Sequence, residues 1–224
     1  MSNRFFNPFV GRDYHTGFRG KRILVLGASF YCNKTDCRFF KRCTDVDMKN
    51  SSAYDSICPE YAKENKLLSN EPSYCIEYRP RTYQTFANCM QSLMGTVGYD
   101  STWARMAFTN YIQFFLPATE GIFRDTRATD MCERDFEVFT ETLKELQPHI
   151  VVVWGCVINS CLKEDNPYLV SREELDETEW YLCHIQVPGI SHKIAILNPF
   201  HPSSPHWNKA LPEFKKYFDK AVAE

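Results

Sequence analysis

The sequence lacks an excess of basic charge and lacks any long apolar segment. Its 224 residues carry 26 lysines and arginines against 28 aspartates and glutamates, for a formal net charge of -2. No global positive field is therefore available to attract nucleic acid, and any such contact has to come from a local patch. The longest apolar runs, such as residues 150–154, are far too short to span a bilayer.

The chain also opens without a basic and apolar stretch of the kind that directs secretion. Ten cysteines are present, but several are scattered singly, and reduced thiols fit a chain of this size better than a disulfide framework. We therefore expect a soluble, cytoplasmic protein without a membrane partner. Nothing in the sequence indicates an oligomer, so we expect a monomer.

The pattern of apolar runs predicts an α/β fold in a single domain over residues 1–224. With 44% hydrophobic residues, the chain is long enough for one well-buried core. Strands are expected at 22–26, 106–112, 150–154 and 193–197, a hairpin-like pair around 187–189, and helices at 82–94, 129–146 and up to about 222. This alternation predicts a three-layer sandwich with a central, mainly parallel four-stranded sheet flanked by helices.

A cysteine-rich insertion at about 32–71 interrupts this domain. Cys32, Cys37, Cys43 and Cys58 are separated by four, five and fourteen residues. Four thiolates suit a structural zinc ion or an iron-sulfur cluster. Because no Cys-x2-Cys pair is present, separately packed reduced thiols remain the alternative, and Cys32 could instead line a ligand pocket. No cofactor is expected to be required for chemistry.

Polar residues follow the expected strands where each strand ends. Residues 27–31 follow the first strand, Asn110 sits in or just after the second, Gly155 follows the third and His201 follows the last. The carboxyl ends of parallel strands converge on one crevice, so these residues are expected to meet there. Prolines stiffen the loop 198–207 and can hold His201 in place, although His-Pro-Ser could also be only a strand-to-helix turn.

These segments, in this order, resemble the motifs of the uracil-DNA glycosylase superfamily. Gly27-Ala28-Ser29-Phe30-Tyr31-Cys32 resembles its Gly-Gln-Asp-Pro-Tyr-His loop, Phe108-Thr109-Asn110 its asparagine-bearing strand, and His201-Pro202-Ser203 its final loop. Residues 136–155 are similar to its amphipathic helix and the apolar strand that ends in Trp-Gly. The resemblance covers roughly residues 21–217. It implies a DNA repair enzyme that flips uracil or another deaminated or modified base out of DNA and excises it by hydrolysis of the N-glycosidic bond.

The resemblance also implies roles within the base pocket. His201 would donate a hydrogen bond to the departing base anion, and the backbone at Gly27 and Ala28 would add to that stabilisation. Asn110, with one acceptor and two donors, would read an amide-like base edge, while Tyr31 would close the pocket beside the 5-position. The structural alternatives are a buried Asn110 bonded to local backbone and an ordinary core tyrosine.

Outside the pocket, the same resemblance implies contacts with the DNA itself. Ser203 and Ser204 would contact phosphates, and His206 or Trp207 would wedge into the base stack. Trp207 could instead pack onto the last helix. A local basic patch could come from Arg4, Arg12, Arg19, Lys21, Arg22, Lys209, Lys215, Lys216 and Lys220, although a solvated helix face is the ordinary explanation for the lysines.

The chain departs from the family at its acidic residue. The carboxylate that acts on water in the family would fall at Ser29 or Ala28, and neither residue can supply one. Ser29 can position a water molecule but cannot take its proton without a partner. Three hypotheses follow: a glycosylase that relies on His201 and leaving-group stabilisation, a glycosylase whose base lies elsewhere, with Asp36 as a candidate, and a non-catalytic module that binds nucleic acid or a nucleotide.

Overall fold

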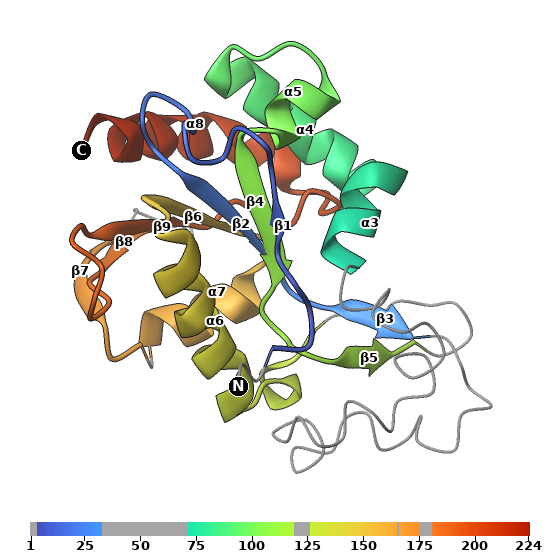
Figure 1. Cartoon of the computed structure of the whole chain (residues 1–224), viewed down its shortest axis with the longest axis vertical. Helices are drawn as coiled ribbons and strands as arrows, with labels where there is room; N and C mark the ends of the chain where they lie inside the picture. The colour runs from blue at the N-terminus through green and yellow to red at the C-terminus, as the bar shows by residue number, and fades with distance from the viewer. Residues whose placement is uncertain (1–3, 33–70, 119–125, 165, 175–180) are drawn as a thin grey trace.

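The computed structural model describes residues 4–32, 71–118, 126–164, 166–174 and 181–224. It is an α/β protein in which helices flank a seven-stranded mixed sheet (Figure 1). The cysteine-rich insertion lies almost entirely outside the described residues, apart from its two ends.

The four expected strands form the centre of the sheet and are parallel to one another. In spatial order they are β4 (Met106–Asn110), β2 (Ile23–Gly27), β6 (Ile150–Val153) and β9 (Ile194–Leu197). The structure buries all four completely, and all four are apolar except at the polar end of β4. Continuous burial on both faces explains why they are apolar throughout rather than at alternate positions.

Three further strands widen the sheet from the four that the sequence predicts to seven. β1 (Phe9–Val10) pairs antiparallel with β4, while β8 (Tyr181–Ile185) and β7 (Leu169–Glu174) extend the other edge antiparallel to β9. β8 and β9 are the expected hairpin-like pair. The edge strands escaped prediction because β1 has two residues and β7 is polar, so neither carries the signal of a buried strand. A separate parallel pair joins β3 (Phe30–Cys32) to β5 (Phe115–Pro117).

Helices cover both faces of the sheet (Figure 1). On one face lie α3 (Glu71–Tyr78), α4 (Arg81–Met94), α5 (Tyr99–Trp103) and α8 (Trp207–Ala223). The other face is covered by α6 (Glu133–Leu146) and α7 (Cys156–Glu164). Two buried clusters result: Ile23 and Val25 point to the first, and Leu24 and Leu26 to the second. This alternation fixes which polar residues at the strand ends can share a face.

The start of α6 differs from the sequence-based expectation. Thr129 and Asp130 were expected to open the helix, but they lie in a separate 3-10 turn, η4 (Ala128–Asp130). The α-helix begins at Glu133, because Asp135 accepts a hydrogen bond from the backbone N-H of Cys132 at 2.9 Å and so caps the helix there.

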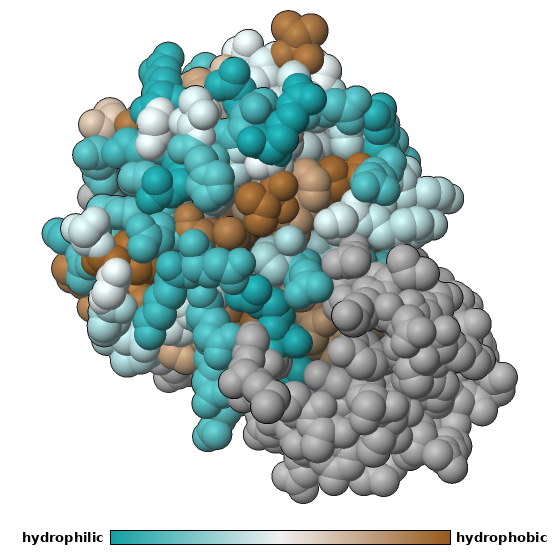
Figure 2. Space-filling view, in the orientation of Figure 1, coloured by the Kyte–Doolittle hydropathy of each residue, from teal (hydrophilic) through white to brown (hydrophobic). Residues whose placement is uncertain are grey.

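The surface is mostly polar on the face shown in Figure 2, with apolar side chains gathered in a band over β1, where Val10 is 39% exposed. Among the described residues, no helix has the length and apolar character needed to cross a membrane.

Candidate functional site

The sheet has its topological switch point at the carboxyl ends of β2 and β6, and we call this edge of the sheet the crevice. From β2 the chain passes over one face of the sheet to reach β4, and from β4 it returns over the other face to reach β6, on the opposite side of β2. Such a reversal is the point at which ligands bind in open α/β sheets. The two strand ends are joined there by a hydrogen bond of 2.9 Å from the Trp154 N-H to the Leu26 carbonyl.

Gly27 and Asn110 lie side by side at this edge, as the sequence predicts. They are register partners in the parallel pair β2–β4. A Cβ added to Gly27 would stand 2.2 Å from Asn110 Oδ1 and 3.1 Å from the nearest ring carbon of Phe108. Glycine is therefore required here because the asparagine side chain occupies the space that any larger residue would need. The contact also shows that Asn110 and Phe108 point to the same face of the sheet.

Asn110 is held deep in the protein with an unused hydrogen-bond donor. Its side chain is 3% exposed, and Nδ2 has no hydrogen-bond partner among the described residues. A buried donor without a partner is unfavourable by about 1–3 kcal/mol. The alternative of an asparagine that satisfies local backbone through Nδ2 therefore does not describe this residue. A ligand with an acceptor at this position would remove the penalty.

A buried network keeps Asn110 in place. The side chain of Gln113 donates to the Asn110 carbonyl at 2.9 Å and accepts the N-H groups of Phe5 and Phe6 at 3.2 Å each. The carboxylate of Asp135 in turn accepts the Gln113 N-H at 2.8 Å. The turn after β4 is thus fixed from the N-terminal segment and from α6, so the asparagine is presented by a rigid element.

His201 lies at the same edge of the sheet and is half-buried. Its ring meets the indole of Trp154 edge-on, with centroids 5.8 Å apart, and that indole packs against Phe108 at 5.4 Å. A line of ring contacts therefore runs from Phe108, which lies beside Gly27 as Asn110 does, through Trp154 to His201. Trp154 Nε1 is a second buried donor without a partner in the described part of the chain.

The bonds of the His201 ring determine which nitrogen carries the proton. The backbone N-H of Ser203 donates to Nδ1 at 3.3 Å, and the Ser203 hydroxyl lies 2.7 Å from the same nitrogen. Because Nδ1 is an acceptor in the first bond, the hydroxyl must donate to it as well, and the proton of a neutral imidazole resides on Nε2. His201 is thereby prepared to donate a hydrogen bond from Nε2.

The loop that carries His201 is anchored to the end of β6. Asn198, which is 3% exposed, donates from Nδ2 to the carbonyls of Val153 and Gly155 at 3.0 Å each. The His201 carbonyl accepts the Ser204 N-H at 2.7 Å and closes a turn. The loop is therefore more than a strand-to-helix connection, since its asparagine fixes the position of the histidine relative to β6.

Ser29 and Tyr31 meet around Thr126. The Ser29 and Tyr31 hydroxyls each lie 3.4 Å from Thr126 Oγ1. Tyr31 and Ala28 pack against the second buried cluster, beneath α6 and α7, whereas Asn110 points to the opposite face. The proposed place of Tyr31 beside the base stays a prediction. Asp36, the candidate for a base elsewhere, lies outside the described residues.

The residues predicted to contact DNA divide into buried and exposed ones. Trp207 is 4% exposed and packs against Phe86 and Phe214, so the packing alternative describes it and the wedge role does not. His206 is exposed and is the aromatic side chain of this loop available to a partner. Ser203 is also exposed, but its hydroxyl proton is used by His201, and the Ser204 hydroxyl accepts the His206 N-H at 3.2 Å.

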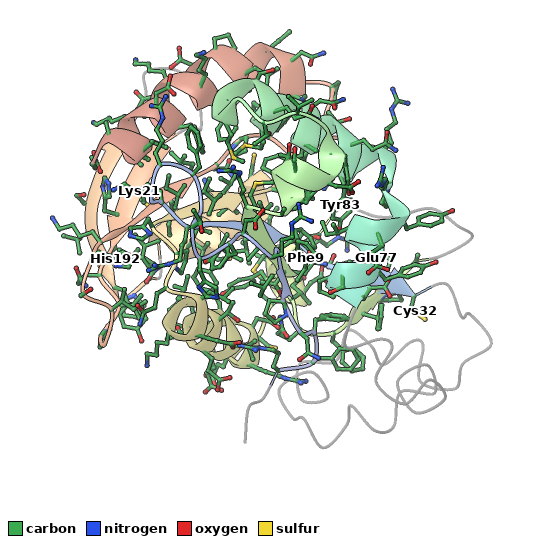
Figure 3. The ribbon with its side chains drawn as sticks, turned by 45° about the horizontal axis from the view of Figure 1, so that its top comes forward. Phe9, Lys21, Cys32, Glu77, Tyr83 and His192 are labelled. Carbon is green, nitrogen blue, oxygen red and sulfur yellow. The ribbon has the colours of Figure 1, made fainter. Side chains whose placement is uncertain are left out.

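The predicted basic patch is divided between two ends of the sheet. Arg22 and Lys21 precede β2 and so lie at the amino ends of the strands, away from the crevice; Figure 3 shows Lys21 and Cys32 on opposite sides of the molecule. Arg4 forms an ion pair with Glu145 at 2.8 Å. The four lysines of α8, Lys209, Lys215, Lys216 and Lys220, are exposed. The helix starts beside the His201 loop, but its Phe218 stacks on Phe18, which precedes β2. Lys209 therefore lies near the crevice, whereas Lys215, Lys216 and Lys220 lie toward the amino ends of the strands.

The cysteine cluster cannot be assembled from the described residues. Cys32 ends β3 and is half-buried, whereas Cys37, Cys43 and Cys58 lie outside the described part. No group of three or more histidine, cysteine or acidic ligands gathers within it. Burial raises the pKa of the Cys75 and Cys89 thiols to about 12, so both stay protonated and pack as small side chains against the core.

The structure adds residues to which the sequence gives no role. Trp154 contacts His201, and Thr126 lies near the Ser29 and Tyr31 hydroxyls. Asn198 anchors the loop that carries His201, and Gln113 supports Asn110. Two of them could have been found: Trp154 stands directly after a buried strand, and Asn198 lies inside the loop that carries His201. Thr126 and Gln113 carry no pattern, because their contacts are made across the fold.

Comparison with known proteins gives no independent guide to function, since the sequence matches no protein-family model and no curated protein.

Proposed function

We propose that this protein is a DNA glycosylase-like enzyme of the uracil-DNA glycosylase type, a monomer that removes uracil or another deaminated or modified base from DNA. The observation that carries the proposal is the buried, unpartnered Nδ2 of Asn110 at the topological switch point. A three-layer arrangement around the parallel strands β4, β2, β6 and β9 is the fold such an enzyme would use. The order of Gly27, Asn110 and His201 along the chain supports the same proposal.

The base would be recognised after it leaves the duplex. Flipping costs a few kcal/mol, and least for a damaged or mismatched base. Nδ2 of Asn110 then donates to an acceptor on the base edge, such as a carbonyl oxygen, and recovers the hydrogen bond that the free protein lacks. A base that presents an amino group at that position would leave Nδ2 unpaired and would be disfavoured.

Bond cleavage would depend on His201. The N-glycosidic bond breaks, its electron pair goes to the base, and the developing anion accepts a hydrogen bond from Nε2-H of the neutral imidazole. Water adds to C1′ of the sugar and loses a proton to solvent. Removing one preorganised donor of this kind commonly lowers the rate about 100- to 1,000-fold. The bond from Ser203 to Nδ1 keeps the required tautomer in place.

The missing carboxylate favours a second candidate function. Ser29, where the family would place an acid, faces the hydroxyl of Thr126 at 3.4 Å, and two hydroxyls cannot act as a base at neutral pH. The alternative is a module that holds a flipped base or a nucleotide without cleaving it. In that case Asn110 would retain its role and His201 would only bind.

Incubation with defined oligonucleotides separates the two functions. Duplexes and single strands bearing uracil, hypoxanthine, xanthine or a modified cytosine are incubated with the protein and assayed for abasic sites. We expect cleavage of at least one substrate, and a loss of about 100-fold or more in His201→Ala. His15→Ala serves as the matched control, because His15 is an exposed histidine before β2, away from the crevice.

Inactivity on every substrate, or full activity in His201→Ala, would rule out the catalytic proposal. Tight binding of one altered-base oligonucleotide without cleavage, abolished by Asn110→Ala, would establish the binding module instead.

A further inference from the structure

A second polar cleft lies at the opposite end of the sheet from the crevice. It has a volume of about 460 Å³ and is lined by the loop before β2 and by the connection from α4 to α5, with Phe18, Arg19, Met94, Thr96, Ser101 and Arg105 among its walls. Arg105 directly precedes β4, whereas Asn110 ends it. The five residue-to-residue steps from Arg105 to Asn110 span about 17 Å in a strand, too far for one nucleotide to occupy both places.

Both arginines of the cleft lack an acidic partner. Among the described residues, no carboxylate lies within ion-pair distance of Arg19 or Arg105, whereas Arg4, Arg12 and Arg79 each have one. Arg105 is half-buried and donates to the Gly17 carbonyl at 3.2 Å, which fixes the guanidinium at the wall of the cleft. Two unneutralised guanidinium groups that face one cavity are suited to an anion.

Arg19 occupies a backbone position at which arginine is unusual. Phe18 and Lys21 exchange both backbone hydrogen bonds at 2.9 Å, so Arg19 and Gly20 form the two-residue loop of a tight turn. Both have positive φ, at 49° and 77°, the pattern of a type I′ turn, which favours asparagine, aspartate or glycine first. An arginine there carries backbone strain that asparagine would avoid, so its side chain rather than its backbone preference accounts for its presence.

The hydroxyl groups of the cleft already donate hydrogen bonds within the protein, so the arginines are the side chains that can bind an anion. Ser101 donates to backbone carbonyls of the α4–α5 connection, and Thr102 donates to the Gly98 carbonyl at 2.9 Å. Thr96, 2.7 Å from the Thr102 hydroxyl, must therefore donate to it. Because these hydroxyl protons are already used, the remaining side-chain donors are the guanidinium N-H groups. The Arg19 guanidinium lies 5.1 Å from the centroid of the Phe18 ring, and Phe18 and Met94 form the apolar part of the wall.

We propose that the cleft between Arg19 and Arg105 binds a phosphate monoester carried by an organic group of nucleotide size. A phosphate monoester carries up to two negative charges at neutral pH, which matches the two arginines. A cavity of a few hundred Å³ holds a ligand of this class. The phosphate can belong to a free mononucleotide or to the 5′-end of a nucleic-acid strand. The proposal does not depend on glycosylase activity, because none of its residues lies at the crevice.

Calorimetric titration tests the cleft with defined probes: adenosine 5′-monophosphate, adenosine, and one oligonucleotide with and without a 5′-phosphate. We expect each phosphorylated probe to bind more tightly than its unphosphorylated counterpart, and added salt to reduce this difference. Arg19→Asn should weaken binding of the phosphorylated probes about tenfold or more, because it removes charge-assisted hydrogen bonds. The variant keeps the turn, since asparagine suits the left-handed position. Arg81→Asn, an exposed arginine at the other end of α4, should bind as the parent does.

The source of the phosphate follows from which probe binds more tightly. A mononucleotide preferred over the 5′-phosphorylated oligonucleotide identifies a free ligand, and the reverse preference identifies a strand end. The proposal would be overturned if no phosphorylated probe bound, or if adenosine bound as tightly as adenosine 5′-monophosphate. It would also be overturned if Arg19→Asn and Arg81→Asn weakened binding equally. Thermal unfolding of both variants checks that the fold is retained.

Discussion

Replacing Gly27 by alanine tests the contact on which the site is built. The added methyl group would stand 2.2 Å from Asn110 Oδ1, a separation that real side chains do not show, and 3.1 and 3.2 Å from two ring carbons of Phe108. The backbone on both sides is held in a parallel ladder, and the Gly27 carbonyl accepts the Tyr111 N-H at 2.9 Å. The asparagine side chain must therefore move, because the strands cannot.

We expect Gly27→Ala to lower the free energy of unfolding by about 1–3 kcal/mol, the usual cost of an overpacked core. Asn110→Ala alone should change it by less than about 1 kcal/mol, because the lost packing is offset by removal of an unpaired buried donor. In the double variant the clash with Asn110 Oδ1 is gone and only the tight contact with the Phe108 ring is left. The cost of Gly27→Ala should then fall by at least about 1 kcal/mol, a coupling expected of residues in direct contact.

Urea unfolding of the four proteins of this cycle provides the measurement. Unfolding is followed by tryptophan fluorescence and by circular dichroism, and coincident transitions justify a two-state analysis. Additive effects of the two substitutions would refute the reasoning, as would a Gly27→Ala protein as stable as the parent. Either result would mean that Asn110 does not occupy the space beside Gly27.

Four other substitutions test the loop at the crevice and the amino end of β6. Trp207→Ala should lower the free energy of unfolding by about 3–5 kcal/mol and His206→Ala by less than about 0.5 kcal/mol; equal effects would contradict the burial of the tryptophan. Asn198→Ala should lower the free energy of unfolding by about 1–3 kcal/mol, because two carbonyls at the end of β6 lose their donor. An unchanged free energy of unfolding would show that the loop is not anchored there. Burial, the stacked ring of His192 and nearby basic groups lower the pKa of His149 to about 4 from the ordinary 6.5. As the pH drops, His149 is therefore protonated in the unfolded chain before it is protonated in the folded protein. The free energy of unfolding falls as the pH drops from about 6.5 to 4. Since the ring is partly exposed, we expect the free energy of unfolding from urea melts to fall by on the order of 1 kcal/mol over this pH range in the parent protein and not in His149→Gln. An equal fall in the two proteins would exclude His149 as the cause.

The centre of the fold could be predicted because its strands are buried on both faces. A run such as Ile23 to Leu26 has no polar position, and only a strand inside a helix-covered parallel sheet meets that demand. The convergence of Gly27 and Asn110 followed from the same argument. The edges could not be predicted in this way, because β1 and β7 depend on a neighbouring strand rather than on their own composition.

The end of the chain shows where a motif alone misleads. Trp207 follows the loop that resembles the family's final motif. From the sequence it could either wedge into the base stack or pack in the protein core. The stripe formed by Trp207, Ala210, Phe214, Tyr217 and Ala221 follows helical spacing and places the tryptophan on the buried face of α8. Periodicity could have decided this case. Nothing in the sequence could have shown that Nδ2 of Asn110 lacks a partner, since that depends on every neighbour.

The side-chain amide of Asn110 offers the most direct test of the base-binding crevice. Its nitrogen-15 resonance can be assigned by its absence from the spectrum of Asn110→Ala, and free uracil, hypoxanthine and xanthine can each be titrated into the labelled protein. The account predicts a saturable shift of this resonance with at least one of these bases, because Nδ2 gains an acceptor that it lacks in the free protein. A resonance that stays in place with every base, while the protein still binds altered-base DNA, would contradict it.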